Sequence, residues 1–428
     1  MLSADPSLNL NVEVRRAETP APPGRSRSVP RQLPSDIARF TGREENLRQL
    51  DRLLSTEQEG ASAVVITAIA GTAGGGKTAL ATRWGHRVAD RFPDGQLYVN
   101  LHGYSQEEPV TGAQALRQLL GGLGVAPDEI PHRVDERETL YRTLVAGKRI
   151  LVVLDNAVRP DQIRPILPGS PSCKVVITSR DSLRGLSATH DVRTISLEVL
   201  SADEAQALLV AVLGIGRTRD EMDAVSQLAR LCGYLPLALR LAAARLAGQP
   251  ALLIDDFVAR LRRGNPLVAL DFEEDPHIGV RAAFELSYRF MPEPVRRTFR
   301  LIGLAPGPDI SPDGVVALTG LSAEECGAAI DALVNAHLVG RGDDRRLTMH
   351  DLVRVYARDR SDLDDQADDR RDALSHLFDW YLRTTVAAME LIDPGRLVGL
   401  LDIPLNDEDR RKFRNSDEAW GWLLSFNT

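Results

Sequence analysis

The chain has 428 residues, more than a single hydrophobic core normally supports, so we expect roughly two to four domains. Hydrophobic residues make up 43% and charged residues 26%, a balance typical of soluble globular proteins. The formal net charge of -8 argues against broad, non-specific binding of nucleic acid. The three cysteines, Cys173, Cys232 and Cys326, form no CxxC pair, so neither a disulfide framework nor a zinc site is expected.

The N-terminal segment lacks the apolar stretch of a signal peptide. No run approaches the roughly 18 consecutive apolar residues that a membrane-spanning helix needs. We therefore expect a cytoplasmic protein with no membrane partner.

Residues 1–35 carry scattered prolines and arginines, which predict a flexible linker. A helix is predicted over residues 44–54, where four leucines recur at helical spacing. Within residues 36–200, short continuous apolar runs alternate with helical patterns, which predicts a doubly wound α/β domain with a parallel sheet. The expected strands are 63–70, 96–101, 149–155, 174–178 and 192–197, and the expected helices between them are 78–92, 113–123 and 135–145.

The strand signal fades after Ser201, which forms a capping box with Glu204. Helical patterns predict one helical domain over residues 201–270 and a second over residues 271–358. The second ends in a short hairpin across the turn at residues 342–344, which favours a winged-helix domain. The expected helices are 201–213, 220–232, 236–247, 254–262, 280–288, 295–304, 311–318 and 323–336, and the expected hairpin strands are 338–340 and 345–349.

Residues 359–428 are predicted to form a further helical region. The Asp- and Arg-rich run at 359–372 is interpreted as a solvated helix face or a linker. The last helical pattern carries no stop signal, so we expect the protein to continue beyond Thr428.

The strongest motif is a full match to GxxxxGK[ST], and it stands between a predicted strand and a predicted helix. In this motif the loop N–H groups and the helix N-terminus face the phosphates of a nucleotide, the lysine neutralises their charge, and the hydroxyl binds magnesium. A glycine-rich turn without a ligand is the alternative. The residues expected to bind the nucleotide are Gly71, Gly74, Gly75, Gly76, Lys77, Thr78 and Ala79.

A second motif is the apolar run Ile150–Leu154 followed by Asp155, the pattern of a Walker B strand whose aspartate holds magnesium. The expected magnesium ligands are thus Thr78 and Asp155. The next residue is Asn156, where related ATPases often place a second acid. An amide can position a water but cannot take its proton at pH 7, so hydrolysis is expected to be slow or absent.

A third candidate is Arg180, at the end of the strand that contains Thr178. Its guanidinium could contact a γ-phosphate, although spacing alone favours a surface arginine at a strand end, and only the family resemblance given below favours the γ-phosphate role. No guanine-recognition signature of the NKxD type occurs, so ATP or ADP is the expected nucleotide. The residues predicted to act on the phosphates are Lys77, Asp155, Asn156 and Arg180.

Taken together, these motifs resemble the NB-ARC class of signal-transduction ATPases with numerous domains. Phe40-Thr-Gly-Arg43 resembles the segment that lies against adenine, and Thr178-Ser-Arg180 resembles sensor 1. Gly233-Tyr-Leu-Pro236-Leu-Ala-Leu239 resembles the GLPLA motif, with tyrosine in place of its first leucine. Met349-His350-Asp351 is similar to the MHD motif, whose histidine senses the β-phosphate of ADP.

This resemblance implies nucleotide contacts for Phe40, Arg43, Pro236 and His350, and it implies ARC1-like and ARC2-like roles for the two helical domains. Outside the family, Arg43 would be a solvated charge, Pro236 a helix starter and His350 an ordinary histidine. The remaining histidines form no HxxxH or HExxH pair, so they predict no metal site.

The residues of these motifs and of the segments between them most resemble the ATPase core of large SARP-type regulatory proteins of actinobacteria. The segments that carry this likeness are Phe92–Asn100, Asp155-Asn156 and Leu167–Ser170. Ala4–Leu8 resembles the end of the preceding activation domain, and Trp420–Leu423 resembles the entry to a C-terminal tetratricopeptide sensor. The resemblance implies that DNA is bound only through an N-terminal domain, and that an unknown signal is received by the sensor.

The expected function is a nucleotide switch that regulates transcription of secondary-metabolism genes. In this interpretation the ADP form is closed, and the ATP form is open and self-associates. Two alternatives stay open. One is an ATPase or kinase with rapid turnover, and the other is a DNA-binding winged-helix protein that also carries an ATPase.

Overall fold

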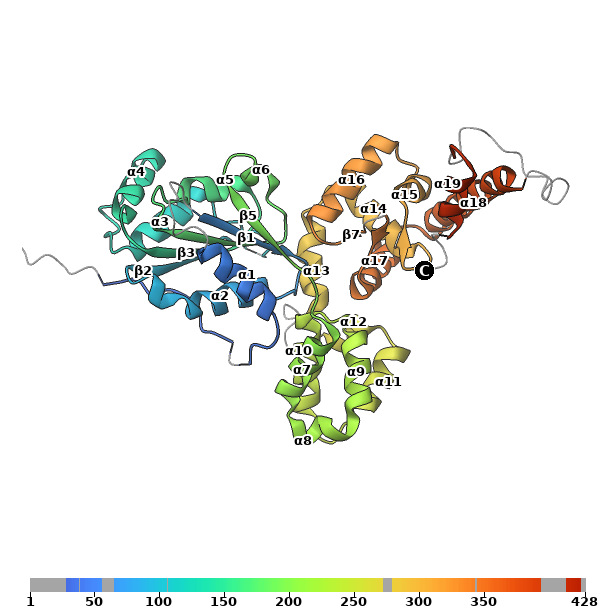
Figure 1. Ribbon diagram of the computed structural model, residues 1–428, viewed down its shortest axis with the longest axis horizontal. Helices are drawn as coiled ribbons and strands as arrows, with labels where there is room; N and C mark the ends of the chain where they lie inside the picture. The colour runs from blue at the N-terminus through green and yellow to red at the C-terminus, as the bar shows by residue number, and fades with distance from the viewer. Residues whose placement is uncertain are drawn as a thin grey trace, which may run out of the picture.

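The computed structural model describes residues 28–37, 39–55, 65–105, 107–271, 279–342, 345–393 and 413–424. They form an α/β body, a helical body below it and a second helical body beside both (Figure 1). Most of the predicted linker, the segment Ala4–Leu8, and the hairpin-turn residues 343–344 lie outside the described residues. In the described ranges, no helix combines the length and apolarity that crossing a bilayer requires.

The α/β body is built on a five-stranded parallel sheet with strand order β2-β3-β4-β1-β5. The predicted strands are all present, as β1 (Val65–Gly71), β2 (Gly95–Asn100), β3 (Ile150–Ala157), β4 (Lys174–Ser179) and β5 (Val192–Leu197). The strand that enters the phosphate motif, β1, is flanked by β4, and β3 lies one strand further. The carboxyl ends of these three strands therefore meet at one edge, where open α/β sheets bind their ligands.

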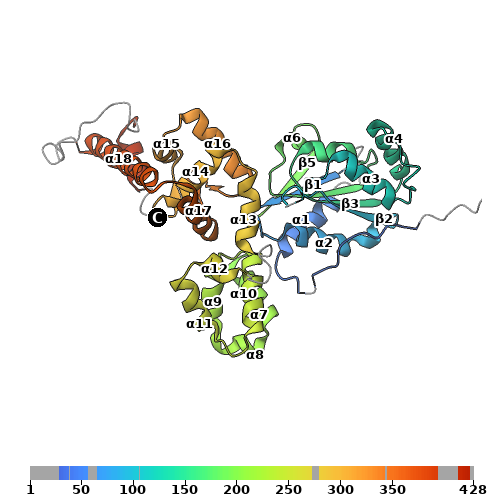
Figure 2. The same ribbon diagram turned by 180° about the vertical axis from the view of Figure 1, so that it is seen from behind.

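Helices cover both faces of this sheet, and its central strands β3 and β4 are buried almost throughout, whereas the edge strand β5 exposes Arg193, Thr194 and Ser196. α1 (Glu44–Ser55) and α2 (Lys77–Arg87) pack on one face, with Trp84 and Ile69 in a common cluster. α3 (Gly112–Gly122), α4 (Val134–Val145) and α5 (Pro160–Ile163) pack on the other, as Figure 2 shows from behind. The described helices confirm the predicted ones within a few residues, except that the predicted helix over 78–92 ends at Arg87 and continues as a short 3-10 turn.

Part of the predicted linker is ordered against the sheet. The backbone of Pro30 and Gln32 exchanges hydrogen bonds with Gln96 on the edge strand β2, and Leu33 packs against the core cluster that contains Trp84. An edge strand offers unpaired N–H and C=O groups, and this segment satisfies those of Gln96. Residues 30–33 therefore belong to the α/β body rather than to a linker.

The first helical body begins with the predicted capping box, in which Ser201 and Glu204 exchange hydrogen bonds at the start of α7. Its helices are α7 (Ala202–Leu213), α8 (Ile215–Thr218), α9 (Met222–Leu231), α10 (Pro236–Gly248), α11 (Ile254–Arg263) and α12 (Pro266–Leu270). α10 starts with a proline at its first position, where the missing N–H costs no helical bond.

The second helical body holds α13 (Val280–Arg289), α14 (Glu293–Leu304), α15 (Pro312–Thr319), α16 (Ala323–Asn335) and α17 (Asp351–Asp364). The predicted hairpin is present as β7 (Gly340–Arg341) and β8 (Leu347–Thr348), and β6 (Asp309–Ile310) adds a third antiparallel strand. α18 (Ala367–Ile392) and α19 (Ser416–Leu424) follow. The Asp- and Arg-rich run spans the end of α17 and the start of α18.

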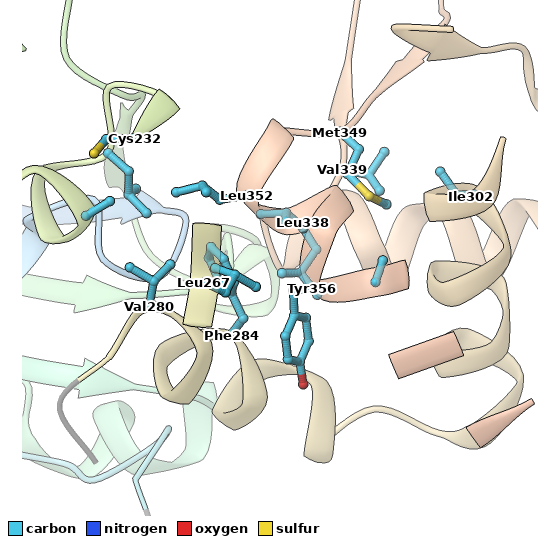
Figure 3. Packing of buried hydrophobic residues seen from close by; sticks show 14 of the residues in the cluster. Cys232, Leu267, Val280, Phe284, Ile302, Leu338, Val339, Met349, Leu352 and Tyr356 are labelled. Atoms are coloured by element: carbon cyan, nitrogen blue, oxygen red, sulfur yellow. The ribbon is translucent and has the colours of Figure 1, made fainter. Parts of the chain in front are cut away.

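One hydrophobic core connects the two helical bodies. Leu267 of the first body lies among Val280, Phe284 and Leu352 of the second (Figure 3). All four side chains are fully or almost fully buried. The shared core fixes the orientation of α13, which is bonded to Arg180 at the end of β4, and of α17, which begins next to the first helical body.

Candidate functional site

The phosphate motif folds as a tight loop between the end of β1 and the start of α2 at Lys77. Gly74 and Gly76 have φ angles of 77° and 91°, a left-handed conformation that residues with a Cβ rarely adopt. A Cβ at Gly74 would also lie 3.0 Å from the Cβ of Leu237 in α10. The glycines therefore allow both the turn and the close approach of the first helical body.

Lys77 is held across this loop. Its Nζ donates hydrogen bonds of 2.8 Å to the carbonyl oxygens of Gly71 and Thr72. Burial, and then the positive charge of Arg180, lower the pKa of Lys77 to about 7, while Asp155 acts in the opposite direction. A phosphate stabilises a buried ammonium group more strongly than an exposed one, because water solvates the buried charge poorly.

Asp155 stands at the end of β3 and is 4% exposed. It accepts hydrogen bonds from three hydroxyl groups: Thr78 Oγ1 at 2.7 Å, Thr178 Oγ1 at 2.5 Å and Tyr98 OH at 3.0 Å. Burial, and then Asp155, raise the pKa of Tyr98, so Tyr98 stays protonated as a donor. The predicted pair Thr78 and Asp155 thus lies together, and Tyr98 is a partner that the sequence analysis missed.

This pair fits magnesium, which binds proteins through one or two carboxylates and takes its other ligands from phosphates and water. The described residues contain no group of three or more His, Cys, Asp or Glu side chains placed to hold a metal by themselves. A magnesium ion here would thus depend on the oxygens of the nucleotide.

Asn156 lies at an irregularity in the pairing of β3 with β4, between Leu154 and Ala157. Its φ is 57°, its N–H donates to Thr178 Oγ1 at 2.9 Å, and its carbonyl accepts from Gly103 at 2.7 Å. Bulges of this kind re-aim side chains next to functional sites. The backbone bonds hold Asn156 at the carboxyl edge of the sheet, where its amide supplies no base.

A small pocket of about 40 Å³ opens beside the loop. Its lining includes six of the residues predicted to bind the nucleotide, together with others that no motif indicated. The predicted lining residues are Phe40, Arg43, Gly75, Gly76, Ala79 and Pro236, and the additional ones are Ile37, Thr41, Leu200, Leu208 and Arg240. The additional residues are mostly apolar positions whose helical or strand-end spacing is that of ordinary core residues.

Arg43 is 7% exposed and is not a solvated charge. Its guanidinium donates to the carbonyl of Gly75 at 3.0 Å and to that of Glu198 at 2.6 Å, and its backbone N–H donates to Glu204 at 2.6 Å. Burial lowers the pKa of Arg43, and Glu204 and Glu198 oppose that shift. Arg43 therefore ties the phosphate loop to the end of β5 and to α7.

The first helical body touches the loop directly. The backbone N–H of Leu237, in the first turn of α10, donates to the carbonyl of Gly74 at 3.2 Å. Pro236, one residue earlier, lines the pocket. The GLPLA-like motif therefore lies beside the phosphate loop. Its contact with a nucleotide stays a prediction.

Arg180 reaches the second helical body. Its guanidinium donates to the carbonyl of Ala283 at 2.6 Å and to Ser287 Oγ at 3.0 Å, both on α13. It also lies over the ring of Tyr104, 5.1 Å from the ring centre, and Tyr104 meets Phe290 edge-on. Burial lowers the pKa of Arg180 to about 10, so it stays charged at neutral pH. The γ-phosphate role of Arg180 stays a prediction.

His350 begins α17 and faces the first helical body. Its Nδ1 accepts from the N–H of Leu352 at 3.2 Å, and its Nε2 lies 2.6 Å from the carbonyl of Gly233. The first bond leaves the proton on Nε2, so Nε2 is the donor to Gly233. The MHD-like histidine is thus joined to the GLPLA-like motif, and its contact with a β-phosphate stays a prediction.

Comparisons with known proteins agree with this geometry. Residues 43–217 match the NB-ARC domain family. The chain is 39% identical over 405 residues to the regulatory protein AfsR of Streptomyces griseus, covering 93% of this chain and 40% of that protein. It is 37% identical over 437 residues to the AfsR protein of Streptomyces coelicolor, covering 99% of this chain and 42% of that protein. The chain therefore spans about two fifths of the length of the curated relatives it matches.

A Walker-type ATPase of Pyrococcus abyssi shares the fold, with a TM-score of 0.52 and 14% identity over 76% of this chain and 98% of that one. The residues matched to the NB-ARC family include the phosphate loop and Asp155 with its hydroxyl donors. The helix α10, which contacts the loop, follows the matched residues. The chain belongs to the NB-ARC class of P-loop ATPases and is homologous to regulatory proteins of the AfsR type.

Proposed function

We propose that this chain is the ATP- and ADP-binding switch of a larger transcriptional regulator, and that this regulator controls secondary-metabolism genes. One observation carries the proposal: both helical bodies are bonded to the nucleotide edge of the sheet. Leu237 of the first body donates to Gly74, and α13 of the second accepts from Arg180. A ligand that changes this edge acts on both bodies at once.

In the proposed cycle, magnesium is held by Thr78, Asp155 and the nucleotide phosphates. ADP stabilises the closed arrangement, with His350 as the contact from the second body. ATP favours an open, self-associating form, because Arg180 exchanges its α13 partners for the γ-phosphate. The balance shifts only by the difference between the affinities of the two forms for each nucleotide.

The domain assignment is part of this proposal. Residues 36–200 form the nucleotide domain, 201–270 an ARC1-like domain and 271–358 an ARC2-like winged-helix domain. Residues 359–428 lead to a sensor that receives the signal, and DNA is bound through a separate N-terminal domain. The small antiparallel sheet of β6, β7 and β8 supports the winged-helix assignment.

The first experiment is to denature the purified protein and to identify any released nucleotide by chromatography. ADP at about one per chain supports a closed resting state. Affinities for ADP and ATP are then measured for the wild type and for Lys77→Ala. If the variant binds both nucleotides as tightly as the wild type, the proposed site is wrong.

A second candidate function is an ATPase with rapid turnover. Asn156 opposes it, because its main chain is fixed at the end of β3 and its amide cannot accept a proton from water. We expect steady-state phosphate release well below about one per second, the lower end of typical enzyme rates. A faster rate would favour this second candidate.

A further inference from the structure

The nucleotide edge carries a second histidine from the second helical body, His337. It follows the last turn of α16, where its N–H donates to the carbonyl of Val334 and the next N–H, of Leu338, donates to that of Leu333. This helix end places His337 at a φ of 52°, in the left-handed region. A residue with a Cβ is strained there, and strain of this kind concentrates at functional positions.

The end of α16 is docked on the α/β body. Asn335, two residues before His337, accepts a hydrogen bond of 3.3 Å from Ser182. Ser182 lies two residues after Arg180, which is itself bonded to α13. The segment that carries His337 is therefore fixed beside the loop that follows β4, rather than on the outer surface of the second body.

The imidazole of His337 is partly buried, and Lys77 is the charged group that acts on it. Burial, and then Lys77, lower the pKa of His337 to about 4, so the ring is neutral at neutral pH. Its Nε2 is buried and has no hydrogen-bond partner among the described residues. Buried polar atoms without a partner are rare in native proteins, and each calls for an explanation.

The charges around this nitrogen indicate which partner suits it. Lys77 is the charged group that acts on His337, and Arg180 and Asp155 in turn act on Lys77. Asp155 is already engaged by three hydroxyl donors. Lys77 already donates to two carbonyl oxygens and offers no acceptor to His337. The ligand of a GxxxxGK[ST] loop brings anionic oxygens to this lysine, and such an oxygen would accept a hydrogen bond from an Nε2–H group as well.

We propose that His337 is a ligand of the nucleotide, donating from Nε2 to the β-phosphate that Lys77 also contacts. The second body would then reach the closed site through two histidines with separate tasks. His337 contacts the nucleotide held by the α/β body, whereas His350 contacts Gly233 of the first helical body. This inference rests on the proposed nucleotide function of the phosphate loop.

The test compares His337→Ala, His337→Gln and the wild type in ADP affinity and in the phosphorus NMR spectrum of bound ADP. His337→Ala should weaken ADP binding about tenfold or more, the effect of losing a hydrogen bond to a charged group. It should also move the β-phosphorus resonance and leave the α-phosphorus resonance in place. Glutamine keeps an N–H donor at a similar reach and should restore most of the affinity.

His376→Ala, an exposed position on α18, is the matched control and should match the wild type. An ADP affinity within twofold of wild type for His337→Ala overturns the inference, as does an equal shift of both phosphorus resonances. If Lys77→Ala loses ADP while His337→Ala retains it, the switch proposal stands and only the role of His337 falls. If Lys77→Ala retains ADP, the proposed function itself falls.

Discussion

The contact between Gly233 and His350 gives a prediction whose size can be worked out from the structure. Gly233 has a φ of 57°, and a Cβ at this position would overlap the Cε1 and Nε2 atoms of His350. Gly233→Ala should therefore cost about 1–2 kcal/mol for the left-handed backbone. It should cost a further 0.5–1.5 kcal/mol or so because the His350 hydrogen bond is lost.

The two costs separate in a double-mutant cycle. In a His350→Ala background the overlap and the hydrogen bond are already gone, so Gly233→Ala should cost only the backbone part. Urea unfolding followed by circular dichroism gives the change in midpoint for the four proteins. Gly327→Ala is the control: a Cβ there meets nothing within 4 Å inside α16, and alanine should stabilise that helix by about 0.5–1 kcal/mol. Equal losses from Gly233→Ala in both backgrounds would refute the proposed coupling.

Three further predictions follow from the same contacts. Phe290→Ala removes the edge-on contact of Phe290 with Tyr104, worth about 0.5–1.5 kcal/mol, so ADP should dissociate roughly two- to twelvefold faster in a fluorescent-nucleotide assay. The exposed Phe378→Ala is the control. An unchanged rate would mean that the contact between Phe290 and Tyr104 does not stabilise the ADP-bound form. Asn156→Asp supplies a carboxylate where the wild type has an amide, so phosphate release should rise about 10²-fold, and a rate at the wild-type level would mean that another group limits hydrolysis. Burial raises the pKa of Cys232 to about 12, that of Cys326 to about 11, and that of Cys173 as well. A thiol reagent at pH 8 should therefore label none of the three cysteines until the protein is denatured. Rapid labelling of the folded protein would contradict this packing.

The sequence was sufficient to predict the sheet and the phosphate motif at its carboxyl edge because those signals are local. Five apolar runs marked the five strands, and the spacing of the phosphate motif placed Lys77 and Thr78 at the start of α2. Asp155 was identified because the apolar strand that it ends lies downstream of the phosphate motif; many buried strands end in aspartate, so the strand alone would not have been sufficient. These features depend on residues that are near one another in the chain.

Contacts between distant segments could not be read in the same way. Tyr98 occupies an ordinary strand position, and only the pairing of β2 with β3 brings its hydroxyl to Asp155. His337 had no partner histidine at a recognisable spacing, and its Nε2 is buried only because α16 docks beside the loop that follows β4. β6 is two residues long, too short to carry a periodic signal.

The hydroxyl bonds to Asp155 also bear on the order in which ligands arrive. A carboxylate offers about four lone-pair positions, and three hydroxyl groups already occupy most of those of Asp155. A divalent cation arriving by itself must displace these donors with no phosphate oxygens to complete its coordination. The metal should therefore enter as a complex with the nucleotide, and millimolar magnesium alone should leave the thermal unfolding of the protein almost unchanged.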